Sequence, residues 1–425
     1  MKNMYETEKA TETAILVSLS SRETSPTQAE LFLDELASLC TTLGIEVAER
    51  IVVPVVQMNP KYLLGSGKAQ EISDLAERSN ADYIVFDDTI SPSQQRNLER
   101  LSGRCVIDRQ EIILEIFSEH ARTREAILQV GLARMEYSLP RLTRAWTHLS
   151  RQRGGTRGTR GEGETQLEMD RRVVLRKITK LKRELEKLQS QRETRRKQRR
   201  GIPIPTGAIV GYTNAGKSSL LNAMTKAEVK VEDQLFATLD PTTRSLRLSG
   251  GTKILLTDTV GFIRKLPHNL VDAFHSTLEE TAAADFLIHI LDASNPEVEQ
   301  HLHTTWEVLS ELEMDETPSI VVFNKIDLCD DPFVLEQLRN QHPEAVFTSL
   351  RRGVGVDALA AKIERLLFEN SPQVVFRFPL HRFDLVAEVH RSGKVLEEKY
   401  LDGYVILEAQ VPFKLKNKFT DYLSA

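Results

Sequence analysis

The sequence is poor in cysteine and has no long apolar run, and each absence excludes a class of protein. Its three cysteines, Cys40, Cys105 and Cys329, lie far apart in a chain of 425 residues. This separation argues against a disulfide framework or a metal cluster, so we expect buried free thiols. No stretch of about 18 apolar residues is present, as a transmembrane helix requires. The N-terminus is polar without an apolar signal core, so we expect a cytoplasmic protein without stable membrane insertion.

The composition is that of a soluble globular protein with an uneven charge. Charged residues make up 28% of the chain and hydrophobic residues 40%. The length predicts about three domains, each large enough for its own core. The net charge is −5, but residues 141–200 alone carry about +13. We therefore expect that segment to face an acidic partner.

A glycine-rich stretch, GYTNAGKSS at residues 211–219, follows an apolar run and precedes Leu220-Leu221. Strand, glycine loop and helix in this order are the context of a phosphate-binding loop. Lys217 is expected to reach the β- and γ-phosphates of a nucleotide, and the Ser218 hydroxyl to bind Mg²⁺. The predicted nucleotide-binding residues here are Gly211, Tyr212, Thr213, Asn214, Ala215, Gly216, Lys217 and Ser218.

Three further motifs follow in the order that a GTPase requires. Asp258 ends an apolar strand and is expected to hold a water on Mg²⁺, while the Gly261 N–H approaches the γ-phosphate. Asp327 is suited to accept two N–H groups of guanine, which makes GTP the expected nucleotide. The predicted residues of these motifs are Asp258, Thr259, Val260, Gly261, Asn324, Lys325, Ile326, Asp327, Thr348, Ser349 and Leu350.

The fold class that we predict is α/β, with four domains. Residues 1–122 alternate short strands (Ala14–Leu19, Arg50–Gln57, Tyr83–Asp87, Cys105–Asp108) with helices, which predicts a parallel α/β domain. Residues 123–200 predict a basic helical hairpin, 201–371 the P-loop GTPase domain, and 372–425 a small α+β domain. Two local features stay open. Leu64–Lys68 is a tight turn or a second phosphate site, and Asp87-Asp88 is a solvated turn or a cation site.

The predicted hairpin carries an Arg/Gly-rich loop, and the C-terminal region carries no readable function. Leu128 to Leu142 and Val174 to Leu188 have heptad spacing, and Thr165 with Glu168 has the spacing of a capping box. The loop between them is either a solvated segment or an RNA contact made by Arg151, Arg153, Arg157 and Arg160. In the C-terminal region, 374–379, 384–390, 397–401 and 404–409 read as strands and 412–423 as a helix.

Several stretches together resemble the HflX family of ribosome-associated GTPases. They are FDDTISPSQQRNLE (86–99), RTREAILQV (122–130), LPRL with THLSRQ (139–152), GTRGEGETQLEMDRR (158–172) and DTVGFIRKLPHNLVDAF (258–274). The resemblance spans nearly the whole chain. It implies binding to the large ribosomal subunit and its ribosomal RNA, with splitting or rescue of stalled ribosomes under stress. We also expect a monomer when the protein is free.

The resemblance also assigns a first switch, whose residues are Phe236, Ala237, Thr238, Leu239 and Asp240. Thr238 would then touch Mg²⁺ and the γ-phosphate, although Thr242 and Thr243 are rivals that spacing leaves open. Lys217, Thr238 and Gly261 are the expected catalytic residues.

Phe262 stands where small GTPases have a water-orienting glutamine, so we expect slow hydrolysis unless another group assists. Asn214 matches the K⁺ ligand of K⁺-dependent GTPases or is an ordinary loop residue. The alternative functions are a ribosome-assembly GTPase and an RNA-binding or remodelling scaffold with structural GTP.

Overall fold

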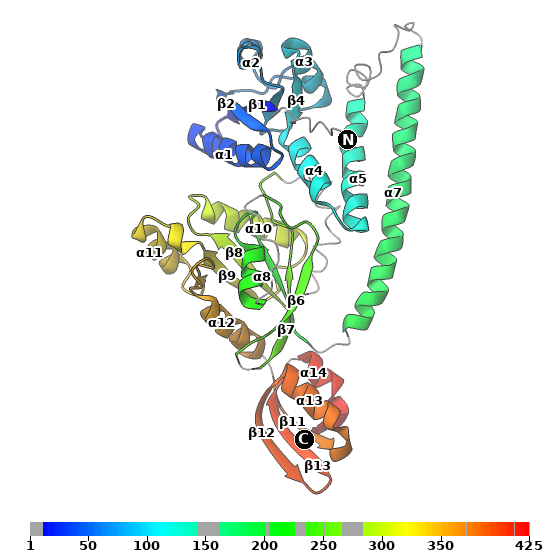
Figure 1. Ribbon diagram of the computed structural model, residues 1–425, viewed down its shortest axis with the longest axis vertical. Coiled ribbons are helices and arrows are strands. Elements are labelled where there is room, and N and C mark those ends of the chain that lie inside the picture. Colours follow the sequence, from blue (N-terminus) through cyan, green and yellow to red (C-terminus); the bar gives the residue numbers. More distant parts are fainter. Residues whose placement is uncertain are drawn as a thin grey trace, which may run out of the picture. The chain divides into compact units, whose positions relative to one another are not determined.

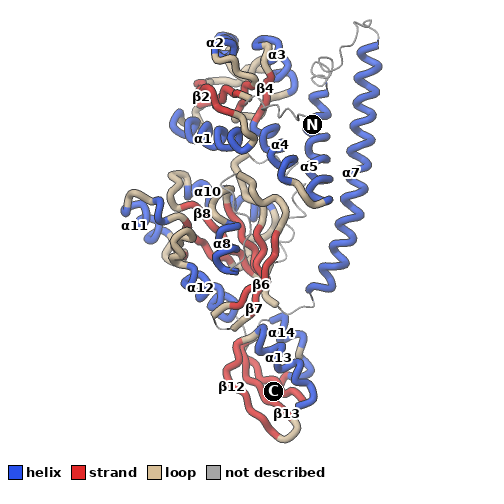
Figure 2. The backbone as a smooth tube through the Cα atoms, in the orientation of Figure 1, coloured by secondary structure: helices blue, strands red, loops and turns tan. Residues whose placement is uncertain are grey.

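The computed structural model describes residues 12–142, 162–200, 204–225, 235–249, 251–265, 284–369, 372–411 and 413–424. They form two compact units that divide between Leu185 and Glu186, and each unit is described by itself. Figure 2 shows three separate sheets in the described chain. No helix of these described ranges combines the length and the apolar character needed to cross a membrane. The predicted α/β class is confirmed.

The first unit contains a parallel four-stranded sheet in the order β2-β1-β3-β4. Its strands are β1 (Thr13–Ser20), β2 (Glu46–Pro54), β3 (Tyr83–Phe86) and β4 (Cys105–Asp108), and its helices are α1 (Pro26–Thr42), α2 (Ser66–Arg78), α3 (Pro92–Ser102) and α4 (Arg109–His120). In Figure 1 the sheet lies between α1 and the pair α2 and α3. Helices α1 and α3 begin alike, because Ser25 with Gln28 and Ser91 with Gln94 form capping boxes before a proline.

Most strands of this sheet lie where the sequence predicts them, but β2 does not. It begins at Glu46 and ends at Pro54, whereas the predicted strand ran from Arg50 to Gln57. Its parallel pairing with β1 runs from Thr13↔Glu46 to Ser20↔Pro54, so the partner strand sets both ends. Pairing of this kind depends on a distant segment, which a local pattern does not reveal.

The two open local features of this domain have structural explanations. Asp87 is buried at the end of β3 and accepts a hydrogen bond from Arg109 Nη1 at 3.0 Å. Arg109, itself buried, also pairs with Glu35 at 2.5 Å. Asp87 is therefore neither in a solvated turn nor in a cation site. Leu64 is buried immediately before α2, and Lys68 on that helix pairs with Glu71 at 2.6 Å.

Two helices complete the first unit, α5 (Arg124–Ser138) and the first half of α7 (Glu162–Arg200), with the 3-10 helix η1 (Leu139–Arg141) after α5. Figure 1 shows α5 and α7 side by side. Lys182 pairs with Glu136 at 2.8 Å, and Arg124 with Glu184 at 3.6 Å. The predicted capping box at Thr165 is wrong, because α7 already begins at Glu162.

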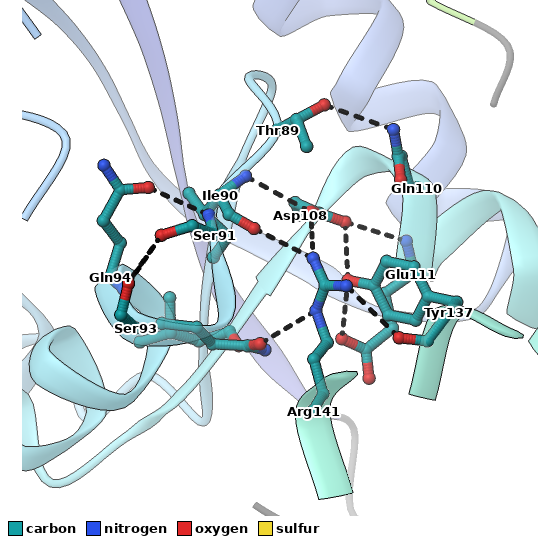
Figure 3. Close-up of polar contacts among 12 residues, drawn as sticks. Thr89, Ile90, Ser91, Ser93, Gln94, Asp108, Gln110, Glu111, Tyr137 and Arg141 are labelled. Carbon is teal, nitrogen blue, oxygen red and sulfur yellow. Dashed lines mark hydrogen bonds and ion pairs between the residues drawn. The ribbon is translucent and has the colours of Figure 1, made fainter. Parts of the chain in front are cut away.

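A polar network joins the parallel sheet to η1 (Figure 3). Asp108, buried at the end of β4, accepts hydrogen bonds from Tyr137 Oη at 2.9 Å and from the Glu111 N–H at 3.1 Å. Arg141 lies over the Tyr137 ring, 3.8 Å from its centroid, and donates to the Ile90 carbonyl at 2.9 Å. The same guanidinium lies 3.5 Å from Asp108. The end of α5 is thus fixed to the carboxyl edge of the sheet.

The second unit contains a six-stranded sheet in the order β10-β9-β8-β5-β7-β6. Its strands are β5 (Thr206–Gly211), β6 (Thr242–Arg247), β7 (Lys253–Asp258), β8 (Phe286–Asp292), β9 (Ser319–Asn324) and β10 (Val346–Phe347). Its helices are α8 (Lys217–Thr225), α10 (Val298–Glu311), the 3-10 helix η2 (Ile326–Leu328), α11 (Pro332–Gln341) and α12 (Val356–Glu369). Only β6 pairs antiparallel, with β7. The four motif-bearing strands β5, β7, β9 and β10 therefore end at the same edge.

A second, antiparallel sheet in the order β12-β13-β11-β14 forms the C-terminal region. Its elements are β11 (Gln373–Pro379), the 3-10 helix η3 (Leu380–Arg382), α13 (Phe383–Ser392), β12 (Lys394–Leu401), β13 (Tyr404–Gln410), α14 (Phe413–Lys418), the 3-10 helix η4 (Thr420–Tyr422) and β14 (Leu423–Ser424).

Two predictions for this C-terminal region are wrong. Residues 384–390 form helix α13, because Leu385, Val386 and Val389 bury one helical face. The predicted helix 412–423 is the short α14, after which the chain returns to the sheet as β14.

Candidate functional site

The glycine loop joins β5 to α8 and adopts backbone angles that require glycine. Gly211 has φ +147° and Gly216 has φ +104°, both in the region where side chains are strained. A Cβ at Gly211 would collide with the Ile290 carbonyl, and one at Gly216 with the Asn324 side chain. Asn214 also has a positive φ, +58°, which asparagine tolerates better than most residues. The loop therefore holds a tight turn directly before the N-terminus of α8.

Lys217 lies at the start of α8 with its ammonium group beneath this loop. Its Nζ donates to the Tyr212 carbonyl at 2.7 Å and to the Gly211 carbonyl at 3.3 Å. Burial lowers the pKa of Lys217 to about 8, although the carboxylate of Asp258 acts against this shift. A Cβ built on Gly261 would lie 2.8 Å from Nζ, so the Gly261 main chain passes directly over the lysine.

Three oxygen-bearing side chains converge from separate segments beside the lysine. Ser218 Oγ donates to Asp258 Oδ2 at 2.6 Å, and Thr238 Oγ1 donates to the same atom at 3.1 Å. The two hydroxyl oxygens lie 2.9 Å apart. The other carboxylate oxygen of Asp258 is buried and has no hydrogen-bond partner in the described chain. Burial raises the pKa of Asp258, and the hydrogen bond from Ser218 opposes this rise.

This cluster distinguishes among the candidate threonines and has the chemistry of a magnesium site. Thr243 lies on β6 and its hydroxyl contacts Thr257 at 2.9 Å, while Thr242 begins the same strand. Thr238 alone of the three is within hydrogen-bond distance of Ser218 in the described residues. Hydroxyl and carboxylate oxygens are hard ligands, and Mg²⁺ takes few of them from protein beside phosphate and water. The donor set at Ser218, Thr238 and Asp258 therefore fits that ion.

A pocket brings together the glycine loop, the predicted first switch and Gly261. Its lining residues are Thr213, Asn214, Gly216, Lys217, Ser218, Ser219, Phe236, Ala237, Thr238 and Gly261. Phe236 and Leu239 are buried on either side of Thr238 and so anchor that stretch. Phe262 is also buried and makes main-chain hydrogen bonds, from its N–H to the Gly211 carbonyl at 3.0 Å and from the Thr213 N–H to its own carbonyl at 2.8 Å. Its ring thus packs away from solvent.

The residues predicted for the base lie next to the glycine loop but outside that lining. Asn324 Nδ2 donates to the Ala215 carbonyl at 2.9 Å, and its Oδ1 accepts from Thr348 Oγ1 at 3.2 Å and from the Leu350 N–H at 3.3 Å. Ser349 Oγ donates to Asp327 Oδ1 at 2.6 Å and lowers the pKa of that carboxyl group. Asn324, at the start of the third loop, therefore ties the fourth loop of this edge to the first.

Sequence reasoning missed two partners in this region, Asp292 and Arg352. Lys325, held at φ +61°, forms an ion pair with Asp292 at 2.8 Å. Arg352 lies 3.9 Å from Asp327. Asp292 ends β8 at the same sheet edge as the motifs, and this position was the signal available in the sequence. The predicted RNA-binding arginines, Arg151, Arg153, Arg157 and Arg160, lie outside the described residues.

Three family models match successive parts of the chain. A model described as "GTP-binding GTPase N-terminal" matches residues 30–118, and one described as "GTP-binding GTPase Middle Region" matches residues 120–199. A third, described as "50S ribosome-binding GTPase", matches residues 206–325. Among solved structures, a GTP-binding protein from Sulfolobus solfataricus in complex with GDP is 28% identical, with 84% of this chain and 98% of that chain covered and a TM-score of 0.43.

Curated relatives match over nearly the full length. The GTPase HflX of Akkermansia muciniphila is 47% identical, with 100% of both chains covered. The GTPase HflX of Chlamydia pneumoniae is 43% identical over 97% of this chain and 88% of its own. For the GTPase HflX of Escherichia coli the identity is 41%, over 89% of each chain. Identity of this extent, together with the pocket at the end of β5, shows that the chain is a P-loop GTP hydrolase and belongs to the HflX family of GTPases.

Proposed function

We propose that this GTPase binds the large ribosomal subunit in the cytoplasm and splits or rescues stalled ribosomes under stress. The observation that carries the proposal is the match of residues 206–325 to a family model described as a 50S ribosome-binding GTPase. A second support is the Arg/Gly-rich sequence 151–164, which lies within a segment, residues 141–200, of about +13 net charge. Arginines in such a stretch bond phosphates and stack on bases, which suits ribosomal RNA.

The nucleotide site follows from the geometry around Lys217. In our proposal the loop 211–218 surrounds the phosphates, Lys217 neutralises the β- and γ-phosphates, and 324–327 with 348–350 bind guanine. Ser218 and Thr238 would hold Mg²⁺, and Asp258 would hold a water of its shell. The ion supplies positive charge that stabilises the transferred phosphoryl group. Among the described residues Oδ1 of Asp258 has no hydrogen-bond partner, which supports this assignment, since a buried carboxylate oxygen ordinarily has one.

Nucleotide state is coupled to ribosome binding by the two switch segments. The γ-phosphate orders the loops of Thr238 and Gly261, and both loops relax after hydrolysis. Phe262 offers no hydrogen bond to the attacking water, so hydrolysis by the free protein is slow, and the ribosome or a K⁺ ion held by Asn214 supplies the missing polarity. The four domains, at 1–122, 123–200, 201–371 and 372–425, and a monomeric free state are part of this proposal.

Cosedimentation tests the ribosome assignment. Mature large subunits and, in parallel, intact ribosomes are mixed with the protein and either a non-hydrolysable GTP analogue or GDP. The proposal expects binding with the analogue, little with GDP, and loss of intact ribosomes from the gradient. Binding only to precursor subunits would favour an assembly GTPase, and equal binding with both nucleotides would favour an RNA scaffold.

The arginine loop is tested by the salt dependence of the same binding. Each phosphate contact changes the slope of log affinity against log salt by about 0.7 to 0.9. We expect the variant with Arg151, Arg153, Arg157 and Arg160 replaced by alanine to lose that amount per arginine. GTP binding by the free variant is the control and should be unchanged. Identical affinities and slopes for parent and variant would show that the loop makes no RNA contact.

A further inference from the structure

The side chain of Tyr212, the second residue of the glycine loop, connects that loop to two other segments. Its ring is only 5% exposed and stacks on His301 of α10, with ring centroids 3.7 Å apart and an interplanar angle of 5°. Its hydroxyl oxygen accepts a hydrogen bond from the main-chain N–H of Arg264 at 2.7 Å. A loop residue whose role was only to offer its main chain to phosphates would not need a buried ring with a placed hydroxyl group.

The segment held by this hydroxyl group begins beside the phosphate-binding lysine. Tyr212 and Phe262 form an isolated parallel bridge, whose main-chain hydrogen bonds keep Phe262 against the loop. The Tyr212 hydroxyl group adds a third hydrogen bond two residues further on, at Arg264. The Gly261 main chain therefore lies over Lys217, whose Nζ in turn donates to the Tyr212 carbonyl. Tyr212 thus contacts the segment with its side chain and the lysine with its main chain.

We propose that Tyr212 is a positioning residue for GTP hydrolysis, whose hydroxyl group, oriented by the stack on His301, holds the 261–264 segment beside Lys217. The 261–264 segment lies where the γ-phosphate is expected. By holding the segment there, the hydroxyl group favours the conformation of the segment that contacts GTP over the conformation that is compatible with GDP. This role belongs to the side chain and is separate from phosphate binding by the main chain of the loop. Because Tyr212 stacks on His301, its side chain also links α10 to the 261–264 segment.

Tyr212→Phe tests the proposal because it removes the hydroxyl group and keeps the stacked ring. Single-turnover hydrolysis of bound GTP should slow by about five-fold, the size expected for one lost hydrogen bond. The affinity for a GTP analogue should fall by a similar factor, while the affinity for GDP stays at the parent value. Amide exchange at Arg264 should accelerate. The matched control is Tyr62→Phe, a tyrosine of the first unit, which should change none of these quantities.

Three outcomes would overturn the proposal. One is an unchanged hydrolysis rate and unchanged preference for GTP over GDP in a folded Tyr212→Phe protein. Another is an equal loss of GDP and analogue affinity, which would mean that Tyr212 only supports the loop structure. The third is unchanged exchange at Arg264, which would mean that the hydroxyl group does not hold the segment. As a second variant, His301→Phe retains an aromatic stack and should keep the parent hydrolysis rate, whereas His301→Ala should slow hydrolysis.

Discussion

His289 gives the second unit a pH dependence that one substitution should remove. Its side chain is fully buried in β8, and neither ring nitrogen has a hydrogen-bond partner among the described residues. Trp306 of α10 meets the ring edge-on, with the centroids 5.6 Å apart. Burial, with a contribution from the charge of Lys217, lowers the pKa of His289 from 6.5 to about 3.

The sign of the effect follows from where the proton binds. The unfolded chain takes up a proton at His289 as the pH falls through 6.5, whereas the folded protein keeps the ring neutral down to about 3. The unfolded state therefore binds more protons in this window, and the free energy of unfolding decreases as the pH falls. Between about pH 7.5 and about pH 5.5 the effect builds up mainly below 6.5, over about one pH unit, and one pH unit corresponds to about 1.4 kcal/mol. The free energy of unfolding should therefore be lower by about 1.4 kcal/mol at about pH 5.5 than at about pH 7.5.

The assay compares the parent with His289→Leu, which removes the titrating ring and its two unpartnered nitrogens. In a Trp146→Phe background Trp306 is the remaining tryptophan, so urea unfolding of the nucleotide-free protein can be followed by its fluorescence. We expect the parent to lose about 1.4 kcal/mol more than the variant between the two pH values. The same loss in both proteins would refute the reasoning, because the pH dependence would then come from other groups.

Four substitutions test the nucleotide site. Asp327→Asn should weaken GTP binding by about ten- to a hundred-fold, through loss of a charged acceptor, and move preference towards XTP; unchanged GTP affinity would place the base elsewhere. Lys217→Ala and Ser218→Ala should each lower the hydrolysis rate by at least about a hundred-fold, measured as phosphate release at saturating Mg²⁺; near-parent turnover would contradict their roles. Phe262→Ala should leave the unstimulated rate within about two-fold, since its ring has no hydrogen bond to lose; a large fall in a folded protein would show that the ring contributes.

The residues that the sequence assigns to a nucleotide site lie close together in the structure, because each motif is local. Each lies at the end of a short apolar strand, and parallel strands bring such ends to one edge. The convergence of Ser218 and Asp258, 40 residues apart, follows from that rule, whereas Thr238 was assigned only by the family resemblance, with Thr242 and Thr243 left open. The position of Asp292 at the end of β8 follows from the same rule, but its pairing with Lys325 was missed because Asp292 belongs to no motif.

Errors occurred where packing overrides a local pattern. Residues 384–390, DLVAEVH, are short and rich in apolar side chains, which suits a strand, yet Leu385, Val386 and Val389 bury one helical face against the C-terminal sheet. Likewise the ends of β2 depend on its pairing with β1. In both cases the deciding partner is distant in the chain, so a window of neighbouring residues does not contain the information.

The carboxyl edge of the N-terminal sheet shows how the same rule can lead to a structural role. In open parallel sheets this edge is the usual place for a ligand. Here the acidic residues at two strand ends already have partners from the chain. Asp87 forms an ion pair with Arg109. Asp108 accepts a hydrogen bond from the Tyr137 hydroxyl group and lies beside the Arg141 guanidinium group. Tyr137 and Arg141 belong to the segment that leads into the Arg/Gly-rich stretch (Figure 3). An acidic residue at a strand end therefore predicts a binding edge only when no arginine of the chain reaches it, and in this domain the edge instead fixes the direction of α5.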